Sequence, residues 1–296
     1  MPAAERGAAR LWLQSMPGLF VLLWSTGFVG AKYGLPYAEP LTFLLLRLAS
    51  VVALMLPLAL AMRAAWPRSL TQAGHVAVVG VLMQGGYLAG VFYSIHLGMS
   101  AGVSALIVGL QPILTAFASA PLFGERLHAR QWSGLMLGFV GVLLVVTGRS
   151  ALSGITPVTL ALSLLALVSI TAGTLYQKRY CGAVDLRTGS VIQFCAAGLV
   201  LLPLALAFET MRVHWSVEFI GALAWLVLVL SIGAISLLYI LIRKGAATKV
   251  ASLFYLVPPT TALMAYAMFG ETLSPAAMAG MVLAAIGVAL VVYRRQ

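Results

Sequence analysis

The chain has 296 residues, of which 62% are hydrophobic and only 8% are charged, and its net charge is +11. A soluble domain carries roughly 25% charged residues, so this composition excludes a protein whose whole surface faces water. The basic residues stand singly or in pairs between apolar runs, which is typical of membrane-orientation signals, and we therefore expect no nucleic acid among the partners.

Apolar runs of roughly 20 residues, the length that crosses a bilayer, follow one another along nearly the whole chain. They predict an all-α membrane protein. The first run follows Arg6 and Arg10 as in a signal peptide, but it continues without a small-residue cleavage site, so we expect it to be retained. The runs predict ten transmembrane helices at roughly residues 13–35, 41–62, 74–97, 101–123, 131–148, 155–177, 188–208, 217–242, 250–269 and 275–293.

A long stretch of the sequence occurs twice, at a constant offset of 146 residues. The segment from Gln111 to Val146 is repeated from Val257 to Val292, and the same offset relates regions further upstream. The matched residues include Pro112 and Pro258, Phe123-Gly124-Glu125 and Phe269-Gly270-Glu271, Gly134 and Gly280, and Gly141 and Gly287. We therefore expect two domains, residues 1–148 and residues 149–296, each of them a five-helix repeat.

The charges of the loops predict how the spans are oriented. When loops are assigned alternately, one face collects most of the basic residues, and the opposite face collects only Lys32, Arg149 and Arg212. By the positive-inside rule the first face is cytoplasmic, so we expect both termini in the cytoplasm. Because each copy holds an odd number of spans, the second copy enters the membrane from the opposite side, and the repeats are inverted. Inverted repeats are an architecture of secondary transporters, with a substrate site at mid-membrane between the copies.

Prolines lie near the middle of two corresponding spans, Pro112 in the fourth and Pro258-Pro259 in the ninth. We expect each to kink its helix and to release carbonyls of the preceding turn, those of Val108, Phe254 and Tyr255. For either helix alone, a plain packing kink is an equal alternative. The matched positions favour the functional interpretation, since interrupted helices in corresponding places indicate a transporter site.

The sequence contains no nucleotide-binding loop, dinucleotide fingerprint, nucleophile elbow or metal-spaced cluster of His and Cys. We therefore expect neither an enzyme nor a cofactor or metal, and two free thiols at Cys181 and Cys195. All seven acidic residues fall in or beside predicted loops, which argues against ATP-driven pumping and against a buried carboxylate that couples transport to protons. We expect Glu125 and Glu271 to cap the following helices.

The predicted spans hold many neutral polar and aromatic side chains, and most such residues only tie helices together. Gln84, Tyr87 and Gln111 stand out because they lie in the third and fourth spans, near the expected interface of the copies. Their amide and hydroxyl groups can serve a small polar solute. The substrate-binding residues that we expect are Trp24, Gln84, Tyr87, Gln111, Pro112, Tyr255 and Pro258.

Arg47 is the charged residue that lies well inside an apolar run, about two turns from the end of the second span. We expect it to snorkel in part and to donate to carbonyls of a neighbouring helix, with direct substrate contact as the alternative. Its repeat mate is Gln193. The glycine pairs Gly86 with Gly90 and Gly134 with Gly138 predict close helix packing within the chain, so we favour a monomer surrounded by membrane lipid.

Taken together, these residues resemble the EamA-type branch of the drug/metabolite transporter superfamily. The resemblance rests on two five-span copies, each ending in a proline-containing helix, a Gly-Glu turn and a Gly-rich last helix, and on Arg47. The motif residues are Pro112, Gly124-Glu125, Gly134 and Gly141, then Pro258, Gly270-Glu271, Gly280 and Gly287. The family implies a bacterial inner-membrane exporter of small metabolites, and the similarity is greatest to its YddG-like exporters of aromatic and other amino acids.

The resemblance and the interior thus predict a carrier that moves small zwitterionic metabolites outward by alternating access. Freed carbonyls and aromatic faces could hold an ammonium group in place of a carboxylate. A passive pore for small solutes, or an exporter of other metabolites or drugs, is the alternative. Saturable flux with trans-stimulation distinguishes the carrier from a pore.

Overall fold

The computed structural model describes residues 3–99, 104, 107–124, 127–146, 155–244, 247–260, 263–264 and 274–292. This part of the chain is helical, and apart from an isolated bridge between Ala38 and Val213 it contains no β-structure. The helices are α1 (Ala3–Gly34), α2 (Pro40–Ala61), α3 (Leu70–Gly80), α4 (Tyr87–His96), α6 (Gln111–Phe123), α7 (Ala129–Val146), α8 (Pro157–Tyr180), α9 (Leu186–Phe208), α10 (Val217–Trp225), α11 (Ile235–Lys244), α12 (Ala247–Ser252) and α14 (Pro275–Val292).

Most helix ends lie within a few residues of the ends predicted from the sequence. Within the described residues, five helical segments are both long and apolar enough to cross a membrane: Pro40–Ala61, Leu70–His96, Pro157–Tyr180, Leu186–Phe208 and Val217–Lys244. Shorter apolar helices cover Ala129–Leu144, Val250–Thr260 and Met278–Val291. The prediction of an all-helical membrane protein is confirmed, and the number of ten spans stays a prediction.

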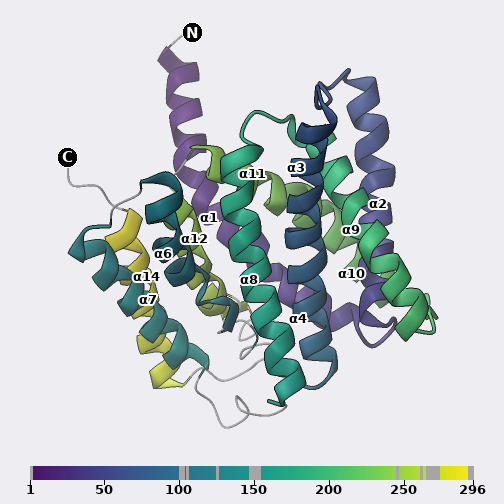
Figure 1. The fold of residues 1–296 in the computed structure, drawn as a ribbon. Coiled ribbons are helices and arrows are strands. Elements are labelled where there is room, and N and C mark those ends of the chain that lie inside the picture. The colour runs from purple at the N-terminus through teal and green to yellow at the C-terminus, as the bar shows by residue number, and fades with distance from the viewer. Residues whose placement is uncertain are drawn as a thin grey trace.

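Helices at corresponding places in the two halves of the sequence pack against each other. α2 contacts α9 and α7 contacts α14, and between the predicted fourth and ninth spans α6 contacts α12. In the same way, α1 packs against the second half at α10, and α8 packs against the first half at α4. Figure 1 shows α7 and α14 together at one edge of the bundle, α2 and α9 at the other, and α8 between them. The described helices of the two halves are therefore interleaved.

Glycines bring several of these helices into backbone contact, as their spacing predicted. A Cβ atom added to Gly90 would lie 2.5 Å from the carbonyl oxygen of Leu162 in α8. One added to Gly287 would lie 2.5 Å from the amide nitrogen of Gly138 and 2.6 Å from the carbonyl oxygen of Gly134. The prediction that these glycines serve packing within the chain is confirmed.

Two glutamates join the end of α9 to the start of α2. The carboxylate of Glu209 accepts hydrogen bonds from the amides of Leu41 (2.8 Å) and Thr42 (2.7 Å) in the first turn of α2, and from the hydroxyl of Tyr93 (2.7 Å). In return, Glu39 accepts from the amide and hydroxyl of Thr210, each at 2.8 Å. A carboxylate favours the positive end of a helix, so these contacts stabilise the start of α2. The described residues do not include Glu125 and Glu271, which the sequence predicted to cap helices, or Arg149, which it predicted to lie on the less basic face.

Two π-helical segments interrupt the helices at matching positions. They are η1 (Val81–Gly86), between α3 and α4, and η2 (Leu226–Ala234), between α10 and α11. Shifted by the repeat offset of 146 residues, η1 falls within η2. The sequence predicted ordinary helices here. The weak helix formers Gly85, Gly86 and Gly233 were the features of the sequence that could have indicated an irregular helix. Short π-helical stretches occur frequently at functional sites.

The helices of the predicted fourth and ninth spans are interrupted, as the matched prolines predicted, but each interruption is a break that precedes the proline and not a kink at it. Residues 109–110 form a turn and α6 begins at Gln111, so Pro112 occupies the first helical turn, where the missing amide hydrogen has no partner to lose. In the other copy, α12 ends at Ser252 and a 3₁₀ turn, η3 (Leu253–Leu256), precedes Pro258. The Phe254 carbonyl accepts from the Val257 amide and is therefore not released.

Candidate functional site

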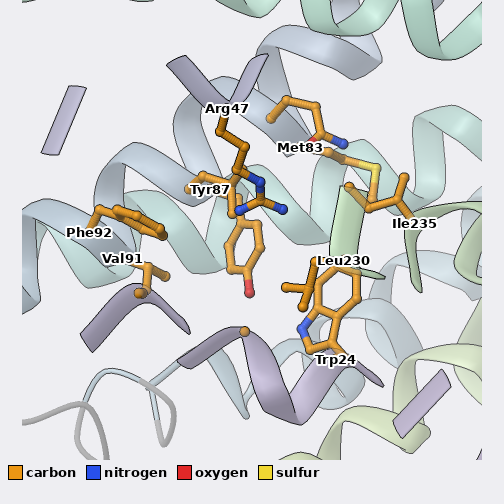
Figure 2. A pocket seen from close by; sticks show the side chains of 12 residues that line it. Trp24, Arg47, Met83, Tyr87, Val91, Phe92, Leu230 and Ile235 are labelled. Carbon is orange, nitrogen blue, oxygen red and sulfur yellow. The ribbon is translucent and has the colours of Figure 1, made fainter. Parts of the chain in front are cut away.

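A cavity is lined by residues of both π-helical segments, and we call it the central cavity. It contains about 530 Å³ of space not filled by atoms, counted to its open mouth. Its walls come from α1, α2, η1, α4, η2 and α11, and thus from both halves of the sequence. It is lined by Trp24, Gly27, Ala31, Arg47, Met83, Gln84, Tyr87, Leu88, Val91, Phe92, Leu230 and Ile235 (Figure 2).

A second cavity, which we call the break cavity, lies where the two helix breaks face each other. Counted to its open mouth, it contains about 250 Å³ of space not filled by atoms, and it is lined by Trp24, Tyr87, Val108, Gly109, Phe254, Val257 and Pro258. Trp24 and Tyr87 line both cavities, and their rings are stacked with centroids 6.3 Å apart and an interplanar angle of 18°. This aromatic pair therefore separates the π-helical segments from the helix breaks.

The structure brings together some of the site residues that the sequence predicted. Trp24, Gln84 and Tyr87 line the central cavity, and Pro258 lines the break cavity beside Trp24 and Tyr87. These residues come from α1, η1, α4 and the segment after η3, so the fold joins positions from both ends of the chain.

Three predicted site residues lie elsewhere. Gln111 is fully buried and its Nε2 donates to the Thr174 hydroxyl at 3.2 Å, which is the interhelical link that the sequence left as the alternative. Pro112 is buried beside it. The ring of Tyr255 packs against Gly138 of α7, where an added Cβ would lie 2.4 Å from the ring. None of the three lines the central or the break cavity.

A chain of hydrogen bonds runs from the central cavity into the bundle. Gln84 Nε2 donates to the Tyr239 hydroxyl at 3.2 Å, and that hydroxyl donates to Gln193 Oε1. Gln193 Nε2 in turn donates to Gln177 Oε1 at 3.3 Å. Because a tyrosine hydroxyl has one proton and gives it to Gln193, it can only accept from Gln84. Gln84 Oε1 is left buried, with no hydrogen-bond partner among the described residues.

The far end of this chain lies at a smaller cavity of about 190 Å³, beside the connection between α8 and α9. Gln177, Gln193 and Tyr239 line it together with Cys181 and Asp185. The hydrogen-bonded Arg187 guanidinium holds the pKa of the Asp185 carboxyl below its usual value, and burial raises the pKa of the Cys181 thiol to about 11. The four side chains of the hydrogen-bonded chain therefore separate this small cavity from the central one.

Arg47 is more deeply buried than the sequence predicted. Its side chain is only 2% exposed, so the expectation of partial snorkelling is wrong. Its Nε donates to the hydroxyl of Ser231 in η2 at 2.8 Å, instead of to helix carbonyls. In Figure 2 the guanidinium extends from α2 toward Tyr87 and Leu230, and Arg47 forms part of the cavity lining. The sequence could already have indicated a functional residue here, because a charged side chain inside an apolar run is costly and is found mainly where it has a function.

The central cavity and the break cavity are lined by neither a carboxylate nor a metal-binding cluster. The linings of the central and break cavities contain no acidic side chain. In the described part of the chain, no group of three or more His, Cys, Asp or Glu residues could bind a metal ion. The arrangement offers hydrogen bonds, aromatic faces and one positive charge, which suits binding of a small solute.

Comparison with known proteins gives a consistent result. The EamA-like transporter family matches residues 18–147 and again residues 157–293. The chain is 28% identical to "Uncharacterized transporter YvbV" of Bacillus subtilis over 92% of its own length and 88% of that protein. It is 26% identical to "Probable amino-acid metabolite efflux pump" of Salmonella typhimurium, over 93% of each protein.

A solved structure described as "Crystal structure of protein" has the same fold, with a TM-score of 0.75 at 20% identity over 93% of this chain and 94% of that one. The match of the family to both halves of the sequence covers most of the 296 residues. The chain thus belongs to the EamA-like transporter family.

Proposed function

We propose that the protein is a secondary transporter that exports small metabolites, with amino acids as its substrate class, by alternating access around the central cavity. The observation that carries the proposal is a cavity built by η1 and η2, adjoining a second cavity at the two helix breaks. Non-helical backbone at membrane depth is tolerated where it is buried in protein or lines a cavity. The name of the Salmonella relative supports amino acids as the substrate class.

The proposed architecture is a pair of inverted five-helix repeats, residues 1–148 and 149–296, with ten spans. The support comes from the repeat offset, the two separate matches of the family, and the matched π-helical segments. The packing of α2 on α9 and of α7 on α14 fits an axis that relates the two copies. The loop charges favour cytoplasmic termini, and the family favours the bacterial inner membrane.

The hydrogen-bonded chain suggests which side of the protein is closed. In the proposed orientation, the cavity beside Cys181 faces the cytoplasm, so the chain from Gln84 to Gln177 closes the cytoplasmic side of the central cavity. Neutral hydrogen bonds contribute only about 0.5–1.5 kcal/mol each, so a modest free energy suffices to exchange them. Opening this chain while the opposite side closes would complete the alternating-access cycle.

Counterflow in proteoliposomes tests the proposal. Purified protein is reconstituted with an excess of unlabelled phenylalanine inside, and uptake of labelled phenylalanine, leucine, a nucleoside and a cationic drug is followed separately. A carrier for amino acids gives saturable uptake with a transient overshoot for the amino acids alone. Linear, non-saturable flux together with single-channel conductance in planar bilayers would instead show a pore.

A further inference from the structure

Arg47 carries a charge that the protein buries without a counter-ion. A guanidinium stays protonated in proteins, and a buried charge is costly unless it is paired. The ion pair found in the described residues joins Asp185 to Arg187, and no described carboxylate lies within 4.0 Å of Arg47. Among the described carboxylates, Glu39 and Glu209 accept the hydrogen bonds that join α2 and α9, and Glu218 lies in the first turn of α10.

The hydrogen bonds of Arg47 leave the tip of the guanidinium available. The group has five N–H donors, and in the described structure Nε is the one with a protein acceptor, the Ser231 hydroxyl at 2.8 Å. This contact fixes the plane of the guanidinium from its Nε edge. The two terminal nitrogens then present a fork of donors at the cavity, the geometry that matches the two oxygens of a carboxylate.

The second copy of the repeat shows that the fold does not require a charge at this place. The position that corresponds to Arg47 is Gln193, which is 2% exposed and engaged in hydrogen bonds with Tyr239 and Gln177. A neutral side chain therefore serves packing equally well at the equivalent point of the bundle. The positive charge of Arg47 therefore needs an explanation other than packing. Arg47 lines the central cavity, whereas Gln193 does not.

We infer that Arg47 binds the carboxylate of the transported solute and that the central cavity selects solutes carrying such a planar anionic group. The inference rests on the proposed function and extends it by naming the residue and the chemical group. Trp24, Tyr87 and Leu230 then surround the rest of the solute. The unpartnered Gln84 Oε1 is available to an ammonium hydrogen. Cations that lack a carboxylate are repelled by the guanidinium.

The test compares phenylalanine with two analogues that each lack one of its charged groups. Phenylalaninamide keeps the ammonium and loses the carboxylate, whereas 3-phenylpropionate keeps the carboxylate and loses the ammonium. In competition against labelled phenylalanine in counterflow, we expect the amide to bind about 10- to 150-fold more weakly, the range for losing hydrogen bonds to a charged group. We expect 3-phenylpropionate to bind more weakly than phenylalanine but clearly more tightly than the amide, because it keeps the hydrogen bonds to the guanidinium and loses only the bond from the ammonium to Gln84 Oε1.

Three variants identify the residue responsible. Arg47→Gln places in the first copy the residue that the second copy already carries, and acid and amide should then compete equally. Arg47→Lys keeps a positive charge and should retain the preference for the acid. The control Ser231→Ala removes the partner of Nε but keeps the charge, so affinity falls while the preference persists.

A binding measurement separates this inference from the proposed transport function. The melting temperature of the detergent-solubilised protein is measured with each of the three compounds at the same concentration, chosen just high enough for phenylalanine to saturate the site. The carboxylate site is supported when both acids raise the melting temperature of the wild type, the amide does not, and Arg47→Gln removes this difference. This result supports the site even when no counterflow is observed, and only the carrier proposal then fails. The inference is overturned when the amide stabilises the wild type as well as the acids do, when neither acid stabilises it, or when Arg47→Gln keeps the preference.

Discussion

The hydroxyl of Tyr239 determines the direction of the hydrogen-bonded chain below the central cavity. It has one proton, so it cannot donate to Gln84 and to Gln193 at once, and the amide orientations on both sides follow from that choice. The side chain is 1% exposed, so water does not substitute for a lost partner. A single buried hydroxyl thus orders two glutamines that lie on different helices.

Tyr239→Phe should therefore lower stability more than an equivalent change elsewhere. The substitution leaves Gln84 Nε2 and Gln193 Oε1 buried without a partner, at a cost of about 1–3 kcal/mol. Tyr93→Phe is the matched control at the corresponding repeat position, where Glu209 keeps its bonds to the amides of Leu41 and Thr42. Thermal unfolding of the purified variants in detergent measures both, and equal melting temperatures would contradict the importance of the chain.

The two glutamines that the sequence singled out should differ in their effect on transport. Gln84 lines the central cavity, whereas Gln111 is tied to Thr174 outside both cavities. Gln84→Ala should raise the half-saturation concentration about 10-fold or more, because the bond that is lost joins Gln84 Oε1 to the charged ammonium group of the substrate. Gln111→Ala should leave that concentration unchanged. Identical kinetics for the two variants would place the substrate away from η1.

At the scale of helices, α7 and α14 pack with their backbones in close contact along several glycines. Gly134, Gly138 and Gly141 of α7 face Gly287 and neighbouring residues of α14, with space for no additional atom. Dispersion contacts between backbones replace the hydrophobic driving force that lipid does not supply. We expect this pair to move as one body when other parts of the protein rearrange.

Gly287→Ala should destabilise the protein by about 1–3 kcal/mol, because the added methyl group meets backbone atoms of α7 that cannot rotate away. Gly198→Ala in α9 is the control, since nothing lies within 4 Å of an added Cβ there. That control should be neutral or more stable by about 0.5–1 kcal/mol, as alanine favours a helix over glycine. The melting temperature of Gly287→Ala should thus fall below that of the wild type, whereas that of Gly198→Ala should stay the same or rise.

The sequence predicted the helices well and did not predict the π-helical segments, for a physical reason. Apolar length and glycine spacing are local properties, so the ends of α2 and α9 and the close packing at Gly134 and Gly138 could be anticipated, although the partner helix could not. A π-helical segment depends on the neighbouring helix as well. At Gly80, next to η1, an added Cβ would lie 2.3 Å from the backbone of Gln193, and no local pattern reveals that approach.

The candidate site was predictable in part. Gln84 and Tyr87 were identified because they lie near the expected interface of the copies and can hydrogen-bond a polar solute, and Trp24 was expected as part of the aromatic wall. Gln111 and Tyr255 were expected for the same reasons, yet they face α8 and α7 because the breaks near residues 109–110 and 253–256 change the direction in which the following residues point. The matched prolines predicted that both helices are interrupted, whereas the exact position of each break, ahead of the proline, came from the structure.

At the scale of the whole molecule, the proposed orientation predicts which loops face each side of the membrane. In a background free of Cys181 and Cys195, Arg212→Cys in the exposed connection from α9 to α10 should react with an impermeant thiol reagent added to whole cells. Ala183→Cys, in the exposed connection from α8 to α9, should react only after permeabilisation. The reverse pattern would refute the inverted repeat.

Native Cys181 should react slowly at neutral pH, because burial raises its pKa to about 11 and little thiolate is present.

The stacked pair of Trp24 and Tyr87 gives the protein a built-in optical reporter. Trp24 is 7% exposed at the junction of the two cavities, whereas Trp66, Trp215 and Trp225 are 41%, 60% and 46% exposed. A solute that enters the central cavity must change the polarity around the Trp24 indole, and its fluorescence should shift in proportion to occupancy. Titration of purified protein should show that shift, Trp24→Phe should abolish it, and the rate of the change would then time the arrival of a solute without any radioactive label.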